Sequence, residues 1–442
     1  MRSDMWRVQN LSLEKFRHLE DFEMSFGPSV TLLVGTNGSG KTTVLDALAV
    51  MLSTLVAELG GGSRSFAHAD AHRIEGDLDS KRRLATSEPQ YPVVGKLSAL
   101  LAGAPHSWER RLGGPRGRTT RGDIDVRQSM ASLRSEATRA GGSQSDETVL
   151  PVVAHYGVER LTGTRRAQGK ISTSRTGAYA SALDPRSDLT RLATFLESLD
   201  GQILAAQAYG DETPTAAIAQ FLAIDSACKS ILEPVGWSNL RWNRGINSLT
   251  LSHEVEGTLP IASLASGTKI AAGLAIDLAS RMARANPHLG ADALLYQTPG
   301  IVLIDEVDLH LHPTWQQQIV PALRRTFPLV QFILSTHSPQ VIATVESDNI
   351  RILRDDRVDI PRFAYGLRPE AVLARVQDTN PNPDVPARTV LNRYLSAVYA
   401  DQGRSEEMLR LRRELDDTLG GPTLNPELIE ADAYLTYSAL ED

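Results

Sequence analysis

Cysteine is almost absent from this 442-residue sequence, in which Cys228 stands alone. A single thiol excludes an internal disulfide framework and suits a reducing compartment, so we expect a cytoplasmic protein. Long apolar runs are missing too, since the most apolar segments, 302–304 and 270–279, are too short or too interrupted to cross a bilayer. No apolar stretch follows a basic start, so we expect no signal peptide and no membrane partner.

Lysine is scarce, with seven among the 46 basic residues, and the net charge is −7. The charge is uneven, because residues 61–180 hold 19 Lys and Arg against 12 Asp and Glu, whereas residues 401–442 hold 4 against 11. Solvated surface is the favoured interpretation of both regions. The alternatives are a basic surface for nucleic acid or an acidic partner, and an acidic docking tail.

Hydrophobic patterning predicts an α/β chain. Alternating apolar residues near the start predict two paired strands, with Val8, Leu11 and Leu13 in one and Phe22, Met24 and Phe26 in the other. A buried strand over 30–34, a glycine loop and a helix over 42–55 follow. Further strands are expected at 91–97, 108–112 and 150–156.

In the second half of the sequence, segments with the hydrophobic period of a helix alternate with strand-like segments. We expect a mobile loop over 162–187, helices over 189–232, strands at 239–242 and 248–253, and buried strands at 301–304 and 331–335 between helices. Beyond residue 351 the pattern is helical. The last helix is expected to start at a Ser405 cap and to end at Gly420 and Gly421. No heptad array or internal repeat is present.

Residues 35–42, Gly-Thr-Asn-Gly-Ser-Gly-Lys-Thr, match the phosphate-loop pattern between a buried strand and a helix. Glycines let backbone N–H groups turn towards phosphates, and the helix start adds its positive dipole end. Lys41 would reach the β- and γ-phosphates of ATP, and the Thr42 hydroxyl would ligate Mg²⁺. A chance match in a glycine-rich turn is the alternative.

The strand at 301–304 ends in two carboxylates. Asp305 would hold the Mg²⁺ hydration shell, and Glu306 would orient and deprotonate the attacking water. Adjacent carboxylates at such a place are often only caps of the next helix, but a phosphate loop in the same chain favours the catalytic interpretation.

Ser266 and Gly267 precede a long apolar helix about 40 residues before Asp305, and Thr336 and His337 follow the next strand. This order resembles the ABC-type ATPase head of the RecF/SMC/OLD branch, in which a Phe-Arg strand opens the pattern, as Phe16 and Arg17 do here. The resemblance implies an α/β P-loop NTPase fold with a mixed sheet, flanking helices, a helical insert and a C-terminal helical tail. It also implies that Ser266 and Gly267 act in trans on ATP held by a second copy, and that His337 contacts the γ-phosphate.

The expected site residues follow from motif and resemblance together. Catalytic roles fall to Lys41, Glu306 and His337, and Mg²⁺ ligation to Thr42 and Asp305. Nucleotide contacts fall to Arg17, Gly35, Asn37, Gly38, Ser39, Gly40, Lys41, Thr42, Thr43, Ser266 and Gly267.

The strings 305–313 and 335–340, with Tyr156-Gly157 and residues 277–287, look like a narrower bacterial group of small AAA-annotated ABC ATPases. That group includes the ATPases of Septu-type (PtuA) and retron-linked anti-phage systems, which are encoded beside an HNH endonuclease. Changes of composition and pattern along the sequence divide the chain into an ATPase lobe at 1–161, a loop and helical insert at 162–238, a second part of the lobe at 239–354 and a tail at 355–442. The position and acidic composition of the tail make it the candidate for partner docking.

The sequence departs from the transporter pattern at two places. Lys269 replaces the usual amide of the signature, and His312 stands where transporters have Asp. His310 with His312, and separately His68, Asp70 and His72, could suggest metal sites, but no further ligands complete a zinc shell. Gln90 and Gln128 are undistinguished candidates for a glutamine loop.

We expect an ATP-hydrolysing switch that dimerises around ATP, with no nuclease in this chain, because the roughly 100 residues after His337 lack the acidic and Cys/His patterns of a metal nuclease. The leading function is the sensor ATPase of a defence system with a nuclease partner. The alternatives are a RecF-like DNA-repair ATPase, a transporter ATPase subunit, and a nucleotide-binding protein without turnover.

Overall fold

The computed structural model describes residues 6–78, 85–139, 148–160, 174–186, 189–209, 215–354, 356–420 and 425–441. A parallel core of five strands carries the phosphate loop and both carboxylates. It belongs to a six-stranded sheet in the order β16-β15-β3-β14-β13-β9, with β16 antiparallel to β15. Its strands are β3 (Val30–Val34), β9 (Val152–Tyr156), β13 (Gly300–Ile304), β14 (Val330–Ser335), β15 (Ile350–Arg354) and β16 (Arg357–Asp359).

The central strands form because their residues are apolar on both faces. Every residue of β3, β9, β13 and β14 is buried, as expected for a parallel sheet covered on both sides. Parallel pairing places the carboxyl ends of these strands at one edge, so the residues that follow them gather there.

A second sheet of five antiparallel strands has the order β2-β1-β6-β7-β8. It consists of β1 (Trp6–Phe16), β2 (Leu19–Ser25), β6 (Val93–Leu101), β7 (Ala104–Leu112) and β8 (Thr119–Gly122). Helix α1 (Lys41–Glu58) contacts β6 of this sheet as well as β9, β13 and β14 of the first. The buried amide of Gln331 joins the sheets, because it accepts from the Val8 N–H and donates to the carbonyls of Val8 and Gly27.

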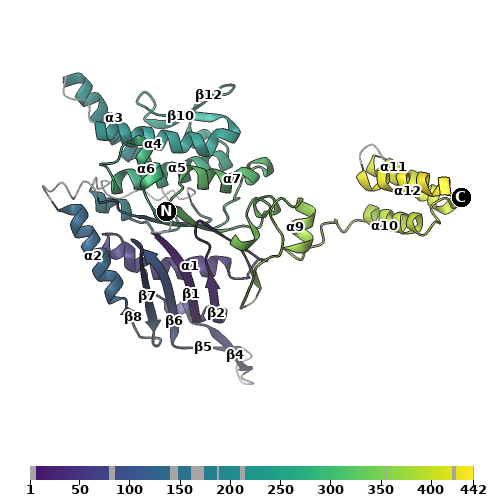
Figure 1. The fold of residues 1–442 in the computed structure, drawn as a ribbon, viewed down its shortest axis with the longest axis horizontal. Coiled ribbons are helices and arrows are strands. Elements are labelled where there is room, and N and C mark those ends of the chain that lie inside the picture. Colours follow the sequence, from purple (N-terminus) through teal and green to yellow (C-terminus); the bar gives the residue numbers. More distant parts are fainter. Residues whose placement is uncertain are drawn as a thin grey trace. The chain divides into compact units, whose positions relative to one another are not determined.

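The remaining elements of the first unit surround these sheets, with β10, α3 and α4 at one end and α2 beside β7 and β8 of the second sheet (Figure 1). Short sheets pair β4 (Arg73–Leu78) with β5 (Ala85–Pro89), and β10 (Trp237–Asn243) with β11 (Ser248–His253) and β12 (Gly257–Pro260). The α-helices are α2 (Ile124–Thr138), α3 (Leu189–Tyr209), α4 (Thr215–Leu232), α5 (Ser266–Ala285), α6 (Ala291–Gln297), α7 (Pro313–Thr326), α8 (Pro339–Ile342) and α9 (Pro369–Arg375). Short 3-10 helices are η2 (His68–Asp70), η3 (Arg175–Tyr179), η4 (Glu233–Val235), η5 (Ile261–Ser263) and η6 (Ser347–Asn349).

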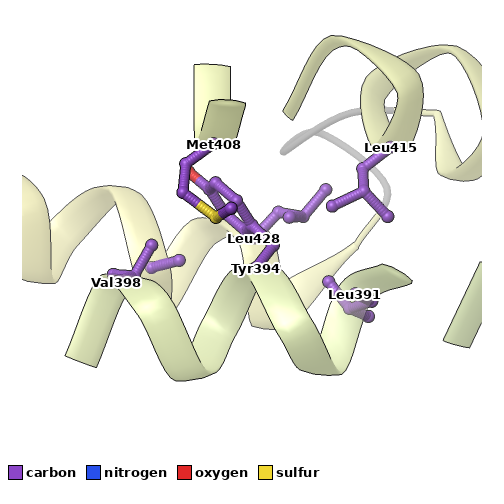
Figure 2. Packing of buried hydrophobic residues seen from close by; sticks show 7 residues of the cluster. Leu391, Tyr394, Val398, Met408, Leu415 and Leu428 are labelled. Atoms are coloured by element: carbon purple, nitrogen blue, oxygen red, sulfur yellow. The ribbon is translucent and has the colours of Figure 1, made fainter. Parts of the chain in front are cut away.

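The chain divides into two compact units, Met1–Val372 and Leu373–Asp442. The second contains α10 (Pro386–Tyr399), α11 (Glu406–Leu419) and α12 (Pro426–Glu441). These three helices pack around a small apolar core that Figure 2 shows, formed by Leu391, Tyr394, Val398, Met408, Leu415, Leu428 and Ala431. The unit boundary lies after Val372, whereas the sequence led us to expect the tail from residue 355.

The predicted α/β fold with a mixed sheet and flanking helices is confirmed, and two details differ. Strands β15 and β16 lie where only helix was expected, and α12 follows the helix expected to be last. The Ser405 cap and the left-handed Gly420 stop of α11 are as predicted. Most of the loop expected over 162–187 lies outside the described residues. No helix in the described ranges combines the length and apolarity needed to span a membrane.

Candidate nucleotide site

The loop between β3 and α1 has the backbone of a phosphate cradle. Gly38 and Gly40 adopt left-handed φ angles of 84° and 101°, which side chains resist. A Cβ at Gly40 would also lie 2.7 Å from the His18 imidazole Nε2. Helix α1 starts at Lys41, so its first N–H groups face the loop.

Lys41 and Ser39 carry polar side-chain groups of the loop that could bind a phosphate. The buried Lys41 ammonium donates to the carbonyls of Gly35 and Thr36, both at 2.9 Å. Burial lowers the pKa of Lys41, against the opposing pull of Asp305, Glu306 and Asp308. The Ser39 hydroxyl is buried and makes no hydrogen bond among the described residues. A buried ammonium and an unsatisfied hydroxyl fit the phosphates of a nucleotide, which would accept from both.

Thr42 and Asp305 meet across 263 residues of sequence, because β3 and β13 both neighbour β14. The Thr42 hydroxyl donates to Asp305 Oδ2 at 2.8 Å, and the Ser335 hydroxyl donates to Asp305 Oδ1 at 2.5 Å. Such a hydroxyl and carboxylate pair has the oxygen chemistry that Mg²⁺ prefers. When bound, the ion would neutralise phosphate charge, and these two residues would hold it.

Glu306 occupies an unusual backbone conformation directly after β13. Its φ of 47° is left-handed, which costs a non-glycine residue on the order of 1 kcal/mol or more. Its N–H donates to the Ser335 hydroxyl at 2.8 Å, and its carbonyl accepts from the Arg160 guanidinium at 2.7 Å. These two hydrogen bonds fix the backbone of Glu306, and the backbone sets the direction of its half-buried side chain.

His337 follows β14 at the same edge and is half-buried. Burial chiefly, and then the charge of Lys41, lower the pKa of His337, which favours the neutral imidazole. Its neighbour Thr336 donates to Asp308 Oδ1 at 2.5 Å. The segment after β14 is thus tied to the segment after β13.

The signature residues lie at the start of α5. Ser266 is exposed, and no hydrogen bond within the described ranges joins it to the phosphate loop of its own chain. Gly267 is buried, and a Cβ there would lie 2.4 Å from the His310 carbonyl oxygen. A glycine at 267 is therefore required for packing against the loop that follows Glu306, whatever it contacts in a second copy.

Other expected residues are placed as follows. Asn37 is exposed on the loop, and Thr43 is buried in α1. Arg17 bonds Asp46 of α1 at 2.9 Å and Asp70 at 3.0 Å, so it braces the helix that carries the loop.

The metal alternatives find no support in the part of the chain that is described, where no group of three potential ligands occurs. Asp70 is engaged by Arg17, His68 stacks on Tyr91, and His312 caps α7. Gln128 lies in α2, and the Gln90 N–H donates to the His72 carbonyl.

Sequence reasoning missed Arg160, Ser335 and Asp308 as parts of the site. Arg160 is only 1% exposed and donates to the carbonyls of Asp305 at 2.5 Å, Glu306 at 2.7 Å and Gly157 at 3.1 Å. Burial lowers the pKa of Arg160 to about 10, so the guanidinium stays charged near neutral pH. An arginine closely following a buried strand was the available signal.

The sheet order, the loop and the carboxylates define a P-loop protein with an ATPase head of the ABC type. Two models of AAA domains match the chain, one described as "AAA domain, putative AbiEii toxin, Type IV TA system" over residues 142–343 and one as "AAA domain" over 10–175. The resemblance to ATPase heads of the RecF/SMC/OLD branch, predicted from the motifs, is confirmed.

Among curated relatives, the chain is 26% identical to the Retron Ec83 probable ATPase of Escherichia coli, over 94% of this chain and 84% of that protein. It is 41% identical to the Septu protein PtuA of Bacillus mycoides over 14% of this chain and 9% of that protein. A solved Smc head domain with an extended coiled coil, bound to the C-terminal domain of ScpA from Pyrococcus furiosus, is 16% identical, with a TM-score of 0.46, and covers 80% of this chain and 96% of its own.

Proposed function

We propose that this chain is a cytoplasmic ATP-hydrolysing switch that dimerises around ATP and Mg²⁺. One observation carries the proposal: groups suited to phosphate and to Mg²⁺ gather at one edge of the sheet, and the signature serine is exposed. Lys41, Thr42 and Asp305 gather at one edge of the sheet, while the exposed Ser266 lies at the start of α5 without a described bond to that loop. A second copy would complete each site.

In this proposal the chain's residues divide the work. Lys41 leaves the loop carbonyls to bind phosphate, and Thr42 and Asp305 hold the metal ion. Glu306 accepts a proton from the attacking water, and His337 steadies that water beside the γ-phosphate. ATP binds the closed dimer better than the separate chains, so it shifts that equilibrium, and hydrolysis reverses the shift.

The test combines turnover and oligomeric state. Glu306→Gln should lower kcat for phosphate release by at least about a hundredfold, since it removes the general base. With ATP the same variant should form a dimer in size-exclusion chromatography with light scattering, and Ser266→Arg added to it should restore the monomer. Phosphate release equal in wild type and Glu306→Gln would remove the catalytic assignment.

We further propose that the switch serves an anti-phage defence system, which its similarity to the retron and Septu proteins supports. The proposed partner is an HNH-type nuclease, as the family resemblance of the sequence motifs implies. The acidic unit at the end of this chain is the proposed docking element, and the chain itself carries no nuclease. Purified protein with Mg²⁺ or Mn²⁺ should leave plasmid DNA intact. Cleavage that disappears on replacing a residue outside the ATP site would contradict this.

A RecF-like ATPase that binds DNA directly is the second candidate. Exposed Arg111, Arg116 and Arg118 on β7 and the following turn favour it. A DNA titration with a steep salt dependence would select this candidate, and absence of binding in the presence of ATP would select the protein-partner function.

A further inference from the structure

Arg160 holds the peptide that joins the two acidic residues. Its guanidinium donates through one nitrogen to the Asp305 carbonyl at 2.5 Å and through the other to the Glu306 carbonyl at 2.7 Å. The side chain is 1% exposed, and it comes from the turn that follows β9, the neighbour of β13 at the sheet edge. Two successive carbonyls are thus fixed by one planar group.

The two peptide groups that Arg160 bonds flank the residue with the strained backbone. Glu306 has a φ of 47°, and such a conformation persists only when its surroundings over-determine it. Arg160 holds the carbonyl, and on the other side the Ser335 hydroxyl accepts from the Glu306 N–H at 2.8 Å. The backbone of Glu306 is therefore clamped at both ends, and that backbone sets where its carboxylate points.

Burying an arginine only to bond backbone carbonyls costs free energy of folding. A buried guanidinium loses its hydration, and the bonds recorded for Arg160 go to backbone carbonyls rather than to a carboxylate. Uncharged side chains can also donate to carbonyls. Arginine adds a rigid fork and a positive charge beneath Asp305, Glu306 and Asp308, which opposes their mutual repulsion.

We propose that Arg160 is a positioning residue for ATP hydrolysis: its fork fixes the strained peptide at Glu306 so that the carboxylate faces the attacking water. The inference rests on the proposed function, in which Glu306 is the base. In this proposal Arg160 does not touch the nucleotide, which Lys41 and the phosphate loop would bind.

The first test separates binding from turnover in the full chain. Arg160→Met should lower kcat by between about tenfold and a hundredfold while KM for ATP changes little, because the loss is one of alignment. Arg160→Lys, which keeps the charge without the fork, should recover only part of kcat. Should Arg160→Met fail to fold, Arg160→Lys carries the test. A kcat within twofold of wild type in the folded variant would overturn the proposal.

Arg110 provides a matched control. It is 2% exposed and grips the carbonyls of Val50 at 2.6 Å and Arg64 at 2.7 Å, but it lies on β7 of the antiparallel sheet. Arg110→Met should lower the melting temperature and leave kcat per folded molecule unchanged. An equal loss of kcat in both variants would assign Arg160 a merely structural role and overturn the proposal.

The second readout needs no nucleotide. The amides of Leu309 and Leu311 donate to the carbonyls of Glu306 and Asp308, so hydrogen exchange at these amides reports the clamp. Exchange there should be at least about tenfold faster in nucleotide-free Arg160→Lys, with α1 unaffected. Unchanged exchange would overturn the inference. A wild type that exchanges slowly here but releases no phosphate would instead defeat the proposed function alone.

Discussion

Ser39 and His155 each bury a polar atom that makes no hydrogen bond among the described residues. For Ser39 the phosphate loop supplies an explanation, since a bound phosphate would accept from its hydroxyl. For His155, on β9, burial disfavours the protonated imidazole. Burial lowers the pKa of the imidazole to about 4, although nearby Asp46 and Asp305 favour the charged form.

The lowered pKa of His155 predicts an acid sensitivity of folding. Between pH 6.5 and about 4 the unfolded chain binds a proton that the folded chain does not, so acidification through this window destabilises the fold. His155→Leu should flatten the dependence of the free energy of unfolding on pH by up to about 1.4 kcal/mol per pH unit there. Urea unfolding at several pH values measures it. An unchanged slope in His155→Leu would contradict the assignment.

The sequence predicted site residues when their partners lay close in sequence or in a known order. Lys41 and Thr42 belong to one loop pattern, and Asp305 and Glu306 end an apolar run. Arg160 was missed because it bonds backbone carbonyls about 145 residues away, and carbonyls carry no residue signature. Ser335 was missed as a clamp for the same reason, since its partner at Glu306 is an N–H.

At the scale of elements, continuous apolar runs predicted β3, β13 and β14 well. Strand β15, with the sequence Ile-Arg-Ile-Leu-Arg, and the three-residue β16 were missed because short arginine-containing strands lack a clear period. Sheet pairing overrode that weak signal: β15 pairs with β3 as a parallel neighbour. Helix α5 was predicted, but its burial on nearly every side was not.

Helix α5 buries an ion pair between two of its own residues, and the same carboxylate accepts a hydrogen bond from β9. Asp277 accepts from Arg281 Nε and from the Tyr156 hydroxyl, both at 2.8 Å. Asp277→Asn should cost about 3–5 kcal/mol, because it leaves the Arg281 charge buried without a counter-ion. Tyr156→Phe should cost only about 1.5 kcal/mol, since the pair remains.

Unfolding midpoints in urea compare these two variants of the α5 and β9 contact. Arg324→Met serves as the control, because its partner Glu346 is 50% exposed and a surface pair contributes at most about 1 kcal/mol. If Asp277→Asn and Tyr156→Phe lower the free energy of unfolding equally, the buried charge of Arg281 is compensated by another group.

At the scale of the molecule, the two units differ in how they are stabilised. The first has two large sheets and a core that spans most of their strands, whereas the described part of the second has seven buried core residues among three helices. So small a core leaves little stability to lose. Partly buried ion pairs such as Arg388 with Glu427 and Arg412 with Asp432 add to it.

This difference predicts that the second unit can be unfolded selectively. Leu428 is fully buried in its core, so Leu428→Ala should cost about 2–5 kcal/mol. Hydrogen exchange on the full chain should then rise across α10, α11 and α12 and stay slow in α1 and β13. ATP hydrolysis should be unchanged, because every residue assigned to the nucleotide belongs to the first unit. Leu409→Ala on α11, where the side chain is 52% exposed, is the control that should change neither. Loss of protection throughout both units would show instead that the chain unfolds as one cooperative body, and the acidic unit would then not be separable from the ATPase.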